Sequence, residues 1–323
     1  IIQSPKTTKT YAHSELLLMV RLLTLKRLFS RVDLASLEQV EASYSGLGPR
    51  HYSVKARLYA LVLMHLLNMP SETMLAGYLS AHRDVAEACG FNQGFKRRRG
   101  TPSQSALNRF KHRVGVEGFE RLFEELTRCL LKAGVAKGRW VVVDSSAVNA
   151  YFHSDPDARW GYTDVDKPFF GYKLHILVDS KSELPIAFRA ASGNVHDSQE
   201  YLNLLGDIEE AESEHAYGDA AYDSEALREA SLSLYDIELH TPRNPRRKGG
   251  KARSSKTLKR MKSVVERVFS RLKLLRFKDL KVKGFTSTAI HFLLALVTML
   301  VVALSATGNR LNRKIRCIRS LTA

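Results

Sequence analysis

The sequence predicts an α/β fold, in which a mixed sheet carries helices on its faces and an all-helical region precedes the sheet. Residues 14–135 have the periodicity of helices, whereas short apolar runs typical of strands begin at Arg139. The 323 residues suffice for a hydrophobic core and for two structural units. We therefore expect a helical region at 1–135, a sheet domain at 136–305 and a basic tail at 306–323.

Four helices are predicted in the first region. They span Leu16–Leu28, Val54–Met69, Glu72–Leu79 behind the cap Ser71, and Ser103–Arg113 behind a Thr-Pro-Ser cap. The loop before the fourth helix contains four consecutive basic residues, Lys96 to Arg99. A basic loop followed by a capped basic helix predicts a DNA-reading unit that uses Arg97, Arg98, Arg99 and Arg109. The alternative is an exposed loop beside a solvated helix.

The elements after Arg139 alternate between strands and helices. We expect strands at Trp140–Val143, Phe169–Asp179, Leu184–Ala191, Ala216–Asp219 and Ile237–Thr241, and helices at Asn194–Leu205, Ser224–Leu232 and around Glu266. Asp197 is expected to cap the first of these helices, and His175 to be packed within its strand. Three strands followed by helix, strand, helix, strand and helix is the order of a ribonuclease H-like fold, a mixed sheet with flanking helices.

The helix around Glu266 has a regular apolar stripe. Its members recur at spacings of three and four: Leu258, Met261, Val265, Val268, Leu272 and Leu275. This stripe should lie on the sheet, with Glu266 at its edge. Lys262 lies one turn before Glu266 and Lys273 two turns after it, so both lysines can neutralise phosphates.

Three carboxylates are the candidate functional groups. Asp144 and Asp219 each close a predicted strand, where side chains converge at a sheet edge, and Glu266 reaches that edge from the basic helix. Carboxylate oxygens suit two Mg²⁺ ions about 4 Å apart that act on a phosphodiester. Asp144 would bridge both ions, and Asp219 and Glu266 would each bind one. The structural alternatives are a turn residue at Asp144, a helix cap at Asp219, with Asp223 competing as cap and ligand, and an ion pair of Glu266 with Lys262.

The charge of the chain points to a polyanionic partner. The net charge is +17 and the pI is about 9.8. Residues 243–283 hold 17 Lys or Arg and only two acids, among them the triplet Arg246, Arg247 and Lys248. A solvated surface usually mixes both signs, so this segment predicts contact with nucleic acid rather than a merely basic surface.

Other function classes are excluded by what the sequence contains. The three cysteines are far apart, without zinc-ligand or redox-motif spacing, which favours a reduced cytoplasmic compartment. No phosphate-binding Walker loop occurs, and the polar start Ile1–Lys6 predicts no secretory signal. The apolar run 289–304 has 16 residues, fewer than the roughly 20 that span a bilayer, so we expect a buried helix and no membrane partner.

Five segments together resemble the DDE transposases of bacterial insertion sequences. They are Val141–Ser146, Gly171–His175, Gly193–Ser198, Tyr217–Ser224 and Val265–Lys273, and Thr101–Phe110 resembles the N-terminal region of the same family. The likeness is to the group that contains the fourth and fifth insertion-sequence families. The fourth family has Tyr and Arg seven and four residues before its Glu, where this chain has Lys259 and Lys262, so the chain is more similar to the fifth.

The resemblance implies a ribonuclease H-like catalytic domain with Asp144, Asp219 and Glu266 as metal ligands, using Mg²⁺, which Mn²⁺ can replace. It implies cut-and-paste transposition: cleavage at the inverted repeats that end a transposon, then strand transfer into target DNA. We expect a homodimer on DNA in the bacterial cytoplasm, associated with the nucleoid, with Lys173 and Lys273 contacting phosphate. Two alternatives stay open: a catalytically silent DNA-binding regulator or domesticated remnant, and a structure-specific nuclease of the same fold.

Overall fold

The computed structural model describes residues 37–38, 52–91, 100–163, 167–208, 211–244, 255–308 and 315–317. The chain forms two compact units, one of residues 1–118 and 301–323 and the other of residues 119–300. The predicted helix at 16–28 and the basic segments 96–99 and 246–248 lie outside the described residues.

Among its described residues, the first unit contains three of the four helices predicted from the sequence and one more. They are α3 (Val54–Leu66), α4 (Glu72–Ala81), α5 (Arg83–Cys89) and the first part of α6 (Gln104–Lys132). The predicted caps are confirmed, because the hydroxyl of Ser71 accepts from Met74 N and that of Ser103 accepts from Ala106 N, each at 3.3 Å. The last helix runs far past its predicted end and is interrupted at Gly115, whose φ of 67° suits glycine.

Polar contacts attach α6 to the helices before it within this unit. The guanidinium of Arg57 lies over the ring of Phe110, 4.4 Å from its centroid. Lys111 forms an ion pair with Glu72. The start of α6, which carries the exposed Arg109, is therefore fixed against α3 and α4.

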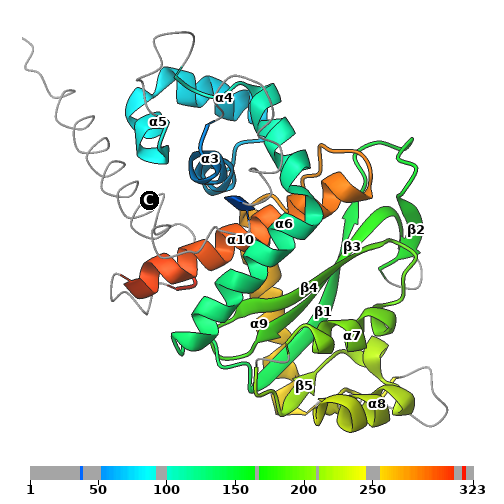
Figure 1. Cartoon of the computed structure of the whole chain (residues 1–323). Helices are drawn as coiled ribbons and strands as arrows, with labels where there is room; N and C mark the ends of the chain where they lie inside the picture. Colours follow the sequence, from blue (N-terminus) through cyan, green and yellow to red (C-terminus); the bar gives the residue numbers. More distant parts are fainter. Residues whose placement is uncertain are drawn as a thin grey trace, which may run out of the picture. The chain divides into compact units, whose positions relative to one another are not determined.

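The second unit contains the mixed sheet that the sequence predicts. Its strands are β1 (Trp140–Asn149), β2 (Arg159–Tyr162), β3 (Pro168–Asp179), β4 (Leu184–Ser192), β5 (His215–Tyr217) and β6 (Glu238–His240). The order is β2-β3-β1-β5-β6, with β4 also paired to β3 (Figure 1). Antiparallel pairs join β1 to β3 and β3 to both β2 and β4, and parallel pairs join β5 to β1 and β6. The ribonuclease H-like fold class is confirmed, and β2 is the one strand not predicted.

Strand β1 is longer than predicted. Its antiparallel pairing with β3 continues from Val141 to Asn149, so the expected end at Val143 is wrong. The parallel pairing with β5, in contrast, covers only residues 140–142. Asp144 therefore lies within a strand, just past the point where its parallel neighbour ends.

The helices that follow the sheet strands are α7 (Asp197–Gly206), α8 (Glu225–Tyr235) and α9 (Lys256–Leu274), with a single 3₁₀ turn, η1, at Ala220–Tyr222. In Figure 1, α7 lies in front of the sheet and α9 behind it. The expected cap Asp197 is wrong, because His196 caps α7: its Nδ1 accepts from Ser198 N at 3.3 Å. The side chain of Gln199 accepts from the backbone N–H of His196 in return.

Most of the apolar stripe predicted for α9 is buried. Met261, Val265, Val268, Leu272 and Leu275 are buried and Leu258 is half-buried, while Val264 and Phe269 also belong to the buried face. The opposite surface carries the exposed basic residues Lys256, Lys259, Arg260, Lys262, Arg267 and Lys273. Helix α9 is thus amphipathic, with one face on the sheet and a cationic face toward solvent.

A buried carboxylate attaches α9 to the turn between β3 and β4. Glu183 has a side chain that is only 6% exposed and accepts from Arg267 Nη2 at 2.8 Å. Arg271 Nη2 lies 3.3 Å from the other carboxylate oxygen and donates to the carbonyl of Glu183 at 2.6 Å. Two arginines on successive turns of α9 therefore bind one turn residue, which fixes the helix along its axis.

Helix α10 (Phe285–Gly308) contains the apolar run that the sequence predicted to be a buried helix. It is longer than the 16-residue run, so the argument from length is wrong: in length and composition it could cross a membrane. Of the apolar window within it, 89% is buried, as in the core helix of a soluble protein.

The Glu183 attachment predicts a stability effect. Glu183→Gln keeps the shape of the side chain but leaves Arg267 and Arg271 without their counter-charge, and removal of one partner of a buried ion pair should lower the free energy of unfolding by about 2–3 kcal/mol. Denaturant unfolding measures this. The matched control is Glu229→Gln, an exposed acid on α8, which should change stability by less than about 0.5 kcal/mol. Equal effects of the two substitutions would contradict the attachment.

Candidate active site

The parallel pairing of β1 with β5 brings two of the three predicted acids together. His215 lies opposite Trp140, and Tyr217 lies opposite Val142. Continued by two residues, this register places Asp219 opposite Asp144. Side chains alternate between the faces of a sheet, so both acids lie on the face that α9 covers.

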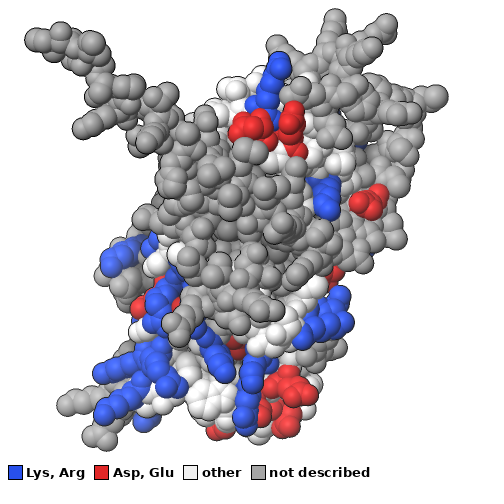
Figure 2. All heavy atoms as spheres, turned by 90° about the vertical axis from the view of Figure 1, so that its left-hand side faces the viewer, with Lys and Arg blue, Asp and Glu red and all other residues white. Residues whose placement is uncertain are grey.

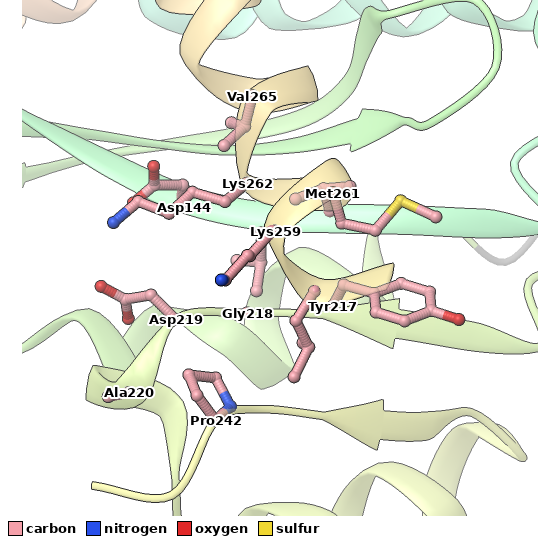
Figure 3. Close-up of a pocket in the computed structure, with 13 residues that line it drawn as sticks. Asp144, Tyr217, Gly218, Asp219, Ala220, Pro242, Lys259, Met261, Lys262 and Val265 are labelled. Carbon is pink, nitrogen blue, oxygen red and sulfur yellow. The ribbon is translucent and has the colours of Figure 1, made fainter. Parts of the chain in front are cut away.

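Asp144 and Asp219 line one cavity of about 280 Å³. Its walls come from both strands and from α9: Val142, Val143, Tyr217, Gly218, Ala220, Pro242, Leu258, Lys259, Met261, Lys262 and Val265. Figure 3 shows the two acids with the sheet strands and the lysines entering from the helix. The cavity therefore combines two carboxylates with two cationic side chains in an otherwise apolar setting.

Backbone hydrogen bonds orient both carboxylates. Asp144 Oδ1 accepts from Ser145 N, and Asp219 Oδ1 accepts from Ala221 N, both at 2.8 Å. The second bond makes Asp219 the cap of η1, a 3₁₀ turn that the sequence did not predict, and not the cap of the following helix α8. It does not compete with metal binding, because Oδ2 of each acid has no hydrogen-bond partner among the described residues.

The electrostatics of the cavity favour a bound cation. Burial, together with the negative charges of Asp219 and Asp197, raises the pKa of Asp144 to about 7. Burial and the charge of Asp197 also raise the pKa of Asp219, and Lys262 offsets part of both shifts. Hard oxygen donors that repel one another in a partly buried site fit a divalent cation such as Mg²⁺, which would neutralise them.

Asp197, which the sequence predicted as a helix cap, is a further acid near the cavity, although it does not line it. Its charge acts on both Asp144 and Asp219. Its Oδ1 accepts from Lys173 Nζ at 2.8 Å and lies 3.9 Å from the Nδ1 of His175. Burial lowers the pKa of His175 to about 4, so this fully buried ring is neutral. The motif Gly193–Ser198 carried the signal for this residue, but not its partner in β3.

Glu266 is not brought into the cavity. It is exposed, one turn after Lys262 and adjacent to Val265, and it is not among the residues that line the cavity. Within the described residues it forms no ion pair, so the alternative pairing with Lys262 is not observed. Asp223 is 8% exposed, and its carboxylate accepts hydrogen bonds from Asn244 N at 2.7 Å and from Arg228. These bonds anchor the loop after β6, so the carboxylate of Asp223 does not cap α8.

The predicted DNA-contacting residues differ in their exposure. Arg109, Lys262 and Lys273 are exposed, and Lys and Arg side chains gather in the lower part of the face shown in Figure 2. Lys173 is only 8% exposed, because its ammonium group donates to Asp197 and to the carbonyl of Val195. Its charge is paired with Asp197 inside the protein, so we no longer propose that Lys173 contacts DNA.

The family profile described as "Transposase DDE domain" matches residues 136–301, which cover the sheet and α9. The chain belongs to this family of transposases, divalent-metal-dependent enzymes that act on DNA.

Solved transposase structures show only distant similarity to the chain. A piggyBac transposase synaptic complex with hairpin DNA has a TM-score of 0.42 at 10% identity, covering 94% of this chain and 80% of that chain. A Mos1 transposase paired-end complex with the left transposon end has a TM-score of 0.21 at 15% identity, covering 60% of each chain. TM-scores below 0.5 do not establish a shared fold, so the assignment depends on the family match.

The raised pKa of Asp144 predicts a pH-dependent stability. Since its pKa is about 7 in the folded protein and 3.8 as its ordinary value, ionisation destabilises the fold increasingly between these two pH values and fully above pH 7. Asp144→Asn should raise the melting temperature by several degrees at pH 8 in chelator, and the gain should shrink towards pH 5. Glu229→Gln should show no such trend. A gain in melting temperature that is the same at both pH values would mean that ionisation of Asp144 does not destabilise the fold.

Proposed function

We propose that this chain cleaves DNA at the ends of a transposon and joins those ends to target DNA, using Asp144 and Asp219 as ligands of catalytic divalent metal. The observation that carries this proposal is the pair of partly buried, mutually repelling carboxylates in a cavity walled by a cationic helix. The repulsion within such a pair destabilises the metal-free fold, and a bound cation would remove this cost.

The residues have separate roles in this chemistry. Two Mg²⁺ ions, or Mn²⁺ in their place, would activate the attacking oxygen and stabilise the leaving oxygen. Asp144 and Asp219 would each offer the oxygen that is not hydrogen-bonded to the backbone. Lys259 and Lys262, which line the same cavity, would neutralise the phosphates on either side of the scissile bond.

We propose Glu266 as the third ligand and Asp197 as a positioning residue. Glu266 follows Lys262 by one turn on the helix that walls the cavity, and it is not bound elsewhere among the described residues. Asp197 is already paired with Lys173, so its carboxylate is occupied. Glu266 would reach the metal by a rotation of its exposed side chain or a small shift of α9 when DNA binds.

The proposed partner is double-stranded DNA, both the transposon ends and the target. The support is the density of basic residues in 243–283, the cationic face of α9 and the family. Arg97, Arg98, Arg99 and Arg109 would help to read the ends. Because a transposon has two ends and each chain offers one carboxylate pair, we propose a homodimer on DNA, working in the bacterial cytoplasm at the nucleoid.

The proposed ligands are tested by a nicking and strand-transfer assay on end DNA with Mg²⁺ or Mn²⁺. Loss of groups that merely support metal ligands often costs 10–100-fold, so Asp144→Ala, Asp219→Ala and Glu266→Ala should each lower the rate by more than about 100-fold. End binding should survive, because Lys and Arg supply the phosphate contacts. Asp197→Asn should lower the rate by roughly 10–100-fold, as a positioning residue.

Glu229→Ala, which removes an exposed acid from α8, is the matched control and should cut at the wild-type rate. Wild-type cutting by Glu266→Ala alongside inactivity of Asp197→Asn would make Asp197 the third ligand. Nicking without transfer of a 3′-hydroxyl end would identify a nuclease. End binding without nicking in either metal would identify a regulator.

DNA binding should depend steeply on salt. Replacing Arg246, Arg247 and Lys248 by Ala should reduce the slope of log affinity against log salt by up to about 3, since each lost phosphate contact removes about 0.9. Replacing the exposed lysines Lys132, Lys137 and Lys181 removes the same charge elsewhere and should leave the slope nearly unchanged. Equal slopes for the two triple variants would show that the basic segment does not contact DNA.

A further inference from the structure

A second cluster of ligand-type side chains lies at the edge of the sheet. The parallel pairing of β5 with β6 places His215 opposite Glu238 and Tyr217 opposite His240. His215, Glu238 and His240 therefore lie on one face of two neighbouring strands. His215 precedes Asp219 by four residues, about 13 Å of extended strand, so this cluster is separate from the carboxylate cavity.

The cluster is defined by three atoms that face one another. His240 Nε2 lies 3.1 Å from His215 Nδ1. Glu238 Oε2 lies 3.4 Å from His215 Nδ1 and 3.5 Å from His240 Nε2. Each of these distances joins two of the same three atoms, His215 Nδ1, Glu238 Oε2 and His240 Nε2. The three donor atoms therefore form one nearly equilateral triangle.

This triangle has the dimensions of a metal centre. Zinc binds imidazole nitrogen and carboxylate oxygen at about 2.0–2.2 Å, and a tetrahedron with such bonds has its ligand atoms about 3.3–3.5 Å apart. We infer that His215, Glu238 and His240 bind a transition-metal ion of the zinc class, with water or another donor as the fourth ligand. Two imidazoles and one carboxylate suit zinc, cobalt or copper, whereas Mg²⁺ prefers oxygen ligands alone.

Neighbouring rings hold the two histidines in place. The ring of Trp140 meets that of His215 edge-on, with centroids 5.6 Å apart. The ring of Tyr217 stacks on that of His240, with centroids 4.9 Å apart. The side chains of the two histidines are about one-third exposed and that of Glu238 is 61% exposed, so an ion can enter the cluster from solvent.

The inferred ion would connect the sheet edge to the catalytic cavity. Strands β5 and β6 have only three residues each. The chain leaves β5 through Gly218 and Asp219, and it leaves β6 towards Pro242, all of which line the cavity. A metal that links β5 to β6 would therefore stabilise two walls of the cavity without taking part in the chemistry there.

The test uses the 323-residue chain stripped of metal with a chelator, in an Asp144→Asn, Asp219→Asn background that removes the two carboxylates of the catalytic cavity. Titration with Co²⁺ should give one bound ion per chain with the visible absorption of a tetrahedral site, and Zn²⁺ should displace it and raise the melting temperature. Mg²⁺ should do neither. His240→Gln should weaken Co²⁺ binding by at least about tenfold.

His153→Gln is the matched control, because His153 is an exposed histidine on the same unit. It should bind Co²⁺ like the background protein. Glu238→Gln tests the site without altering a ring, should His240→Gln fold poorly, and should also weaken binding. No Co²⁺ uptake by the background protein, or equal uptake by the His240→Gln, Glu238→Gln and His153→Gln proteins, would overturn the inference. Because the background lacks the carboxylates of Asp144 and Asp219, which line the catalytic cavity, the result is independent of the proposed transposase chemistry.

Discussion

The carboxylate cavity depends on the parallel pairing of β1 with β5. Three residue pairs bring Asp144 and Asp219, 75 positions apart in the sequence, onto neighbouring positions of one face. The two acids repel one another there, and the raised pKa of Asp144 measures how strongly the folded chain opposes this charge. Strand β1 is held in place against this repulsion by its pairing with β3 from Val141 to Asn149.

Helix α9 closes the cavity, and its position is set by two kinds of contact. The apolar stripe places the helix on the sheet. The bonds from Arg267 and Arg271 to Glu183 fix it further along its axis, because they attach two turns of α9 to one residue of the β3–β4 turn. Lys262, one turn before Arg267, is thereby held at the cavity wall.

The sequence predicted what depends on local pattern and failed where distant partners decide. The element order and most of the α9 stripe follow from periodicity. The approach of Asp144 to Asp219 follows from the neighbouring strands that carry them, although neither acid closes its strand. The true end of β1 depends on how far β3 continues beside it, and the short, largely exposed β2 has no apolar pattern to reveal it. Lys173 was taken for a surface residue because its partner Asp197 lies on another element. The exposure of Glu266 outside the cavity likewise follows from how α9 is rotated on the sheet.

The late place of α9 in the chain has a consequence for biosynthesis. The cavity has no closed wall until residues 256–274 have left the ribosome, whereas the helices of the first unit up to α5 and the β3–β4 hairpin can form from residues already made. Long-range closure between β1 and β5 adds a slow step of high contact order. A nascent or prematurely ended chain would therefore present the N-terminal helices before it has a complete cavity. The helices would form first, and the ability to cut DNA would follow later.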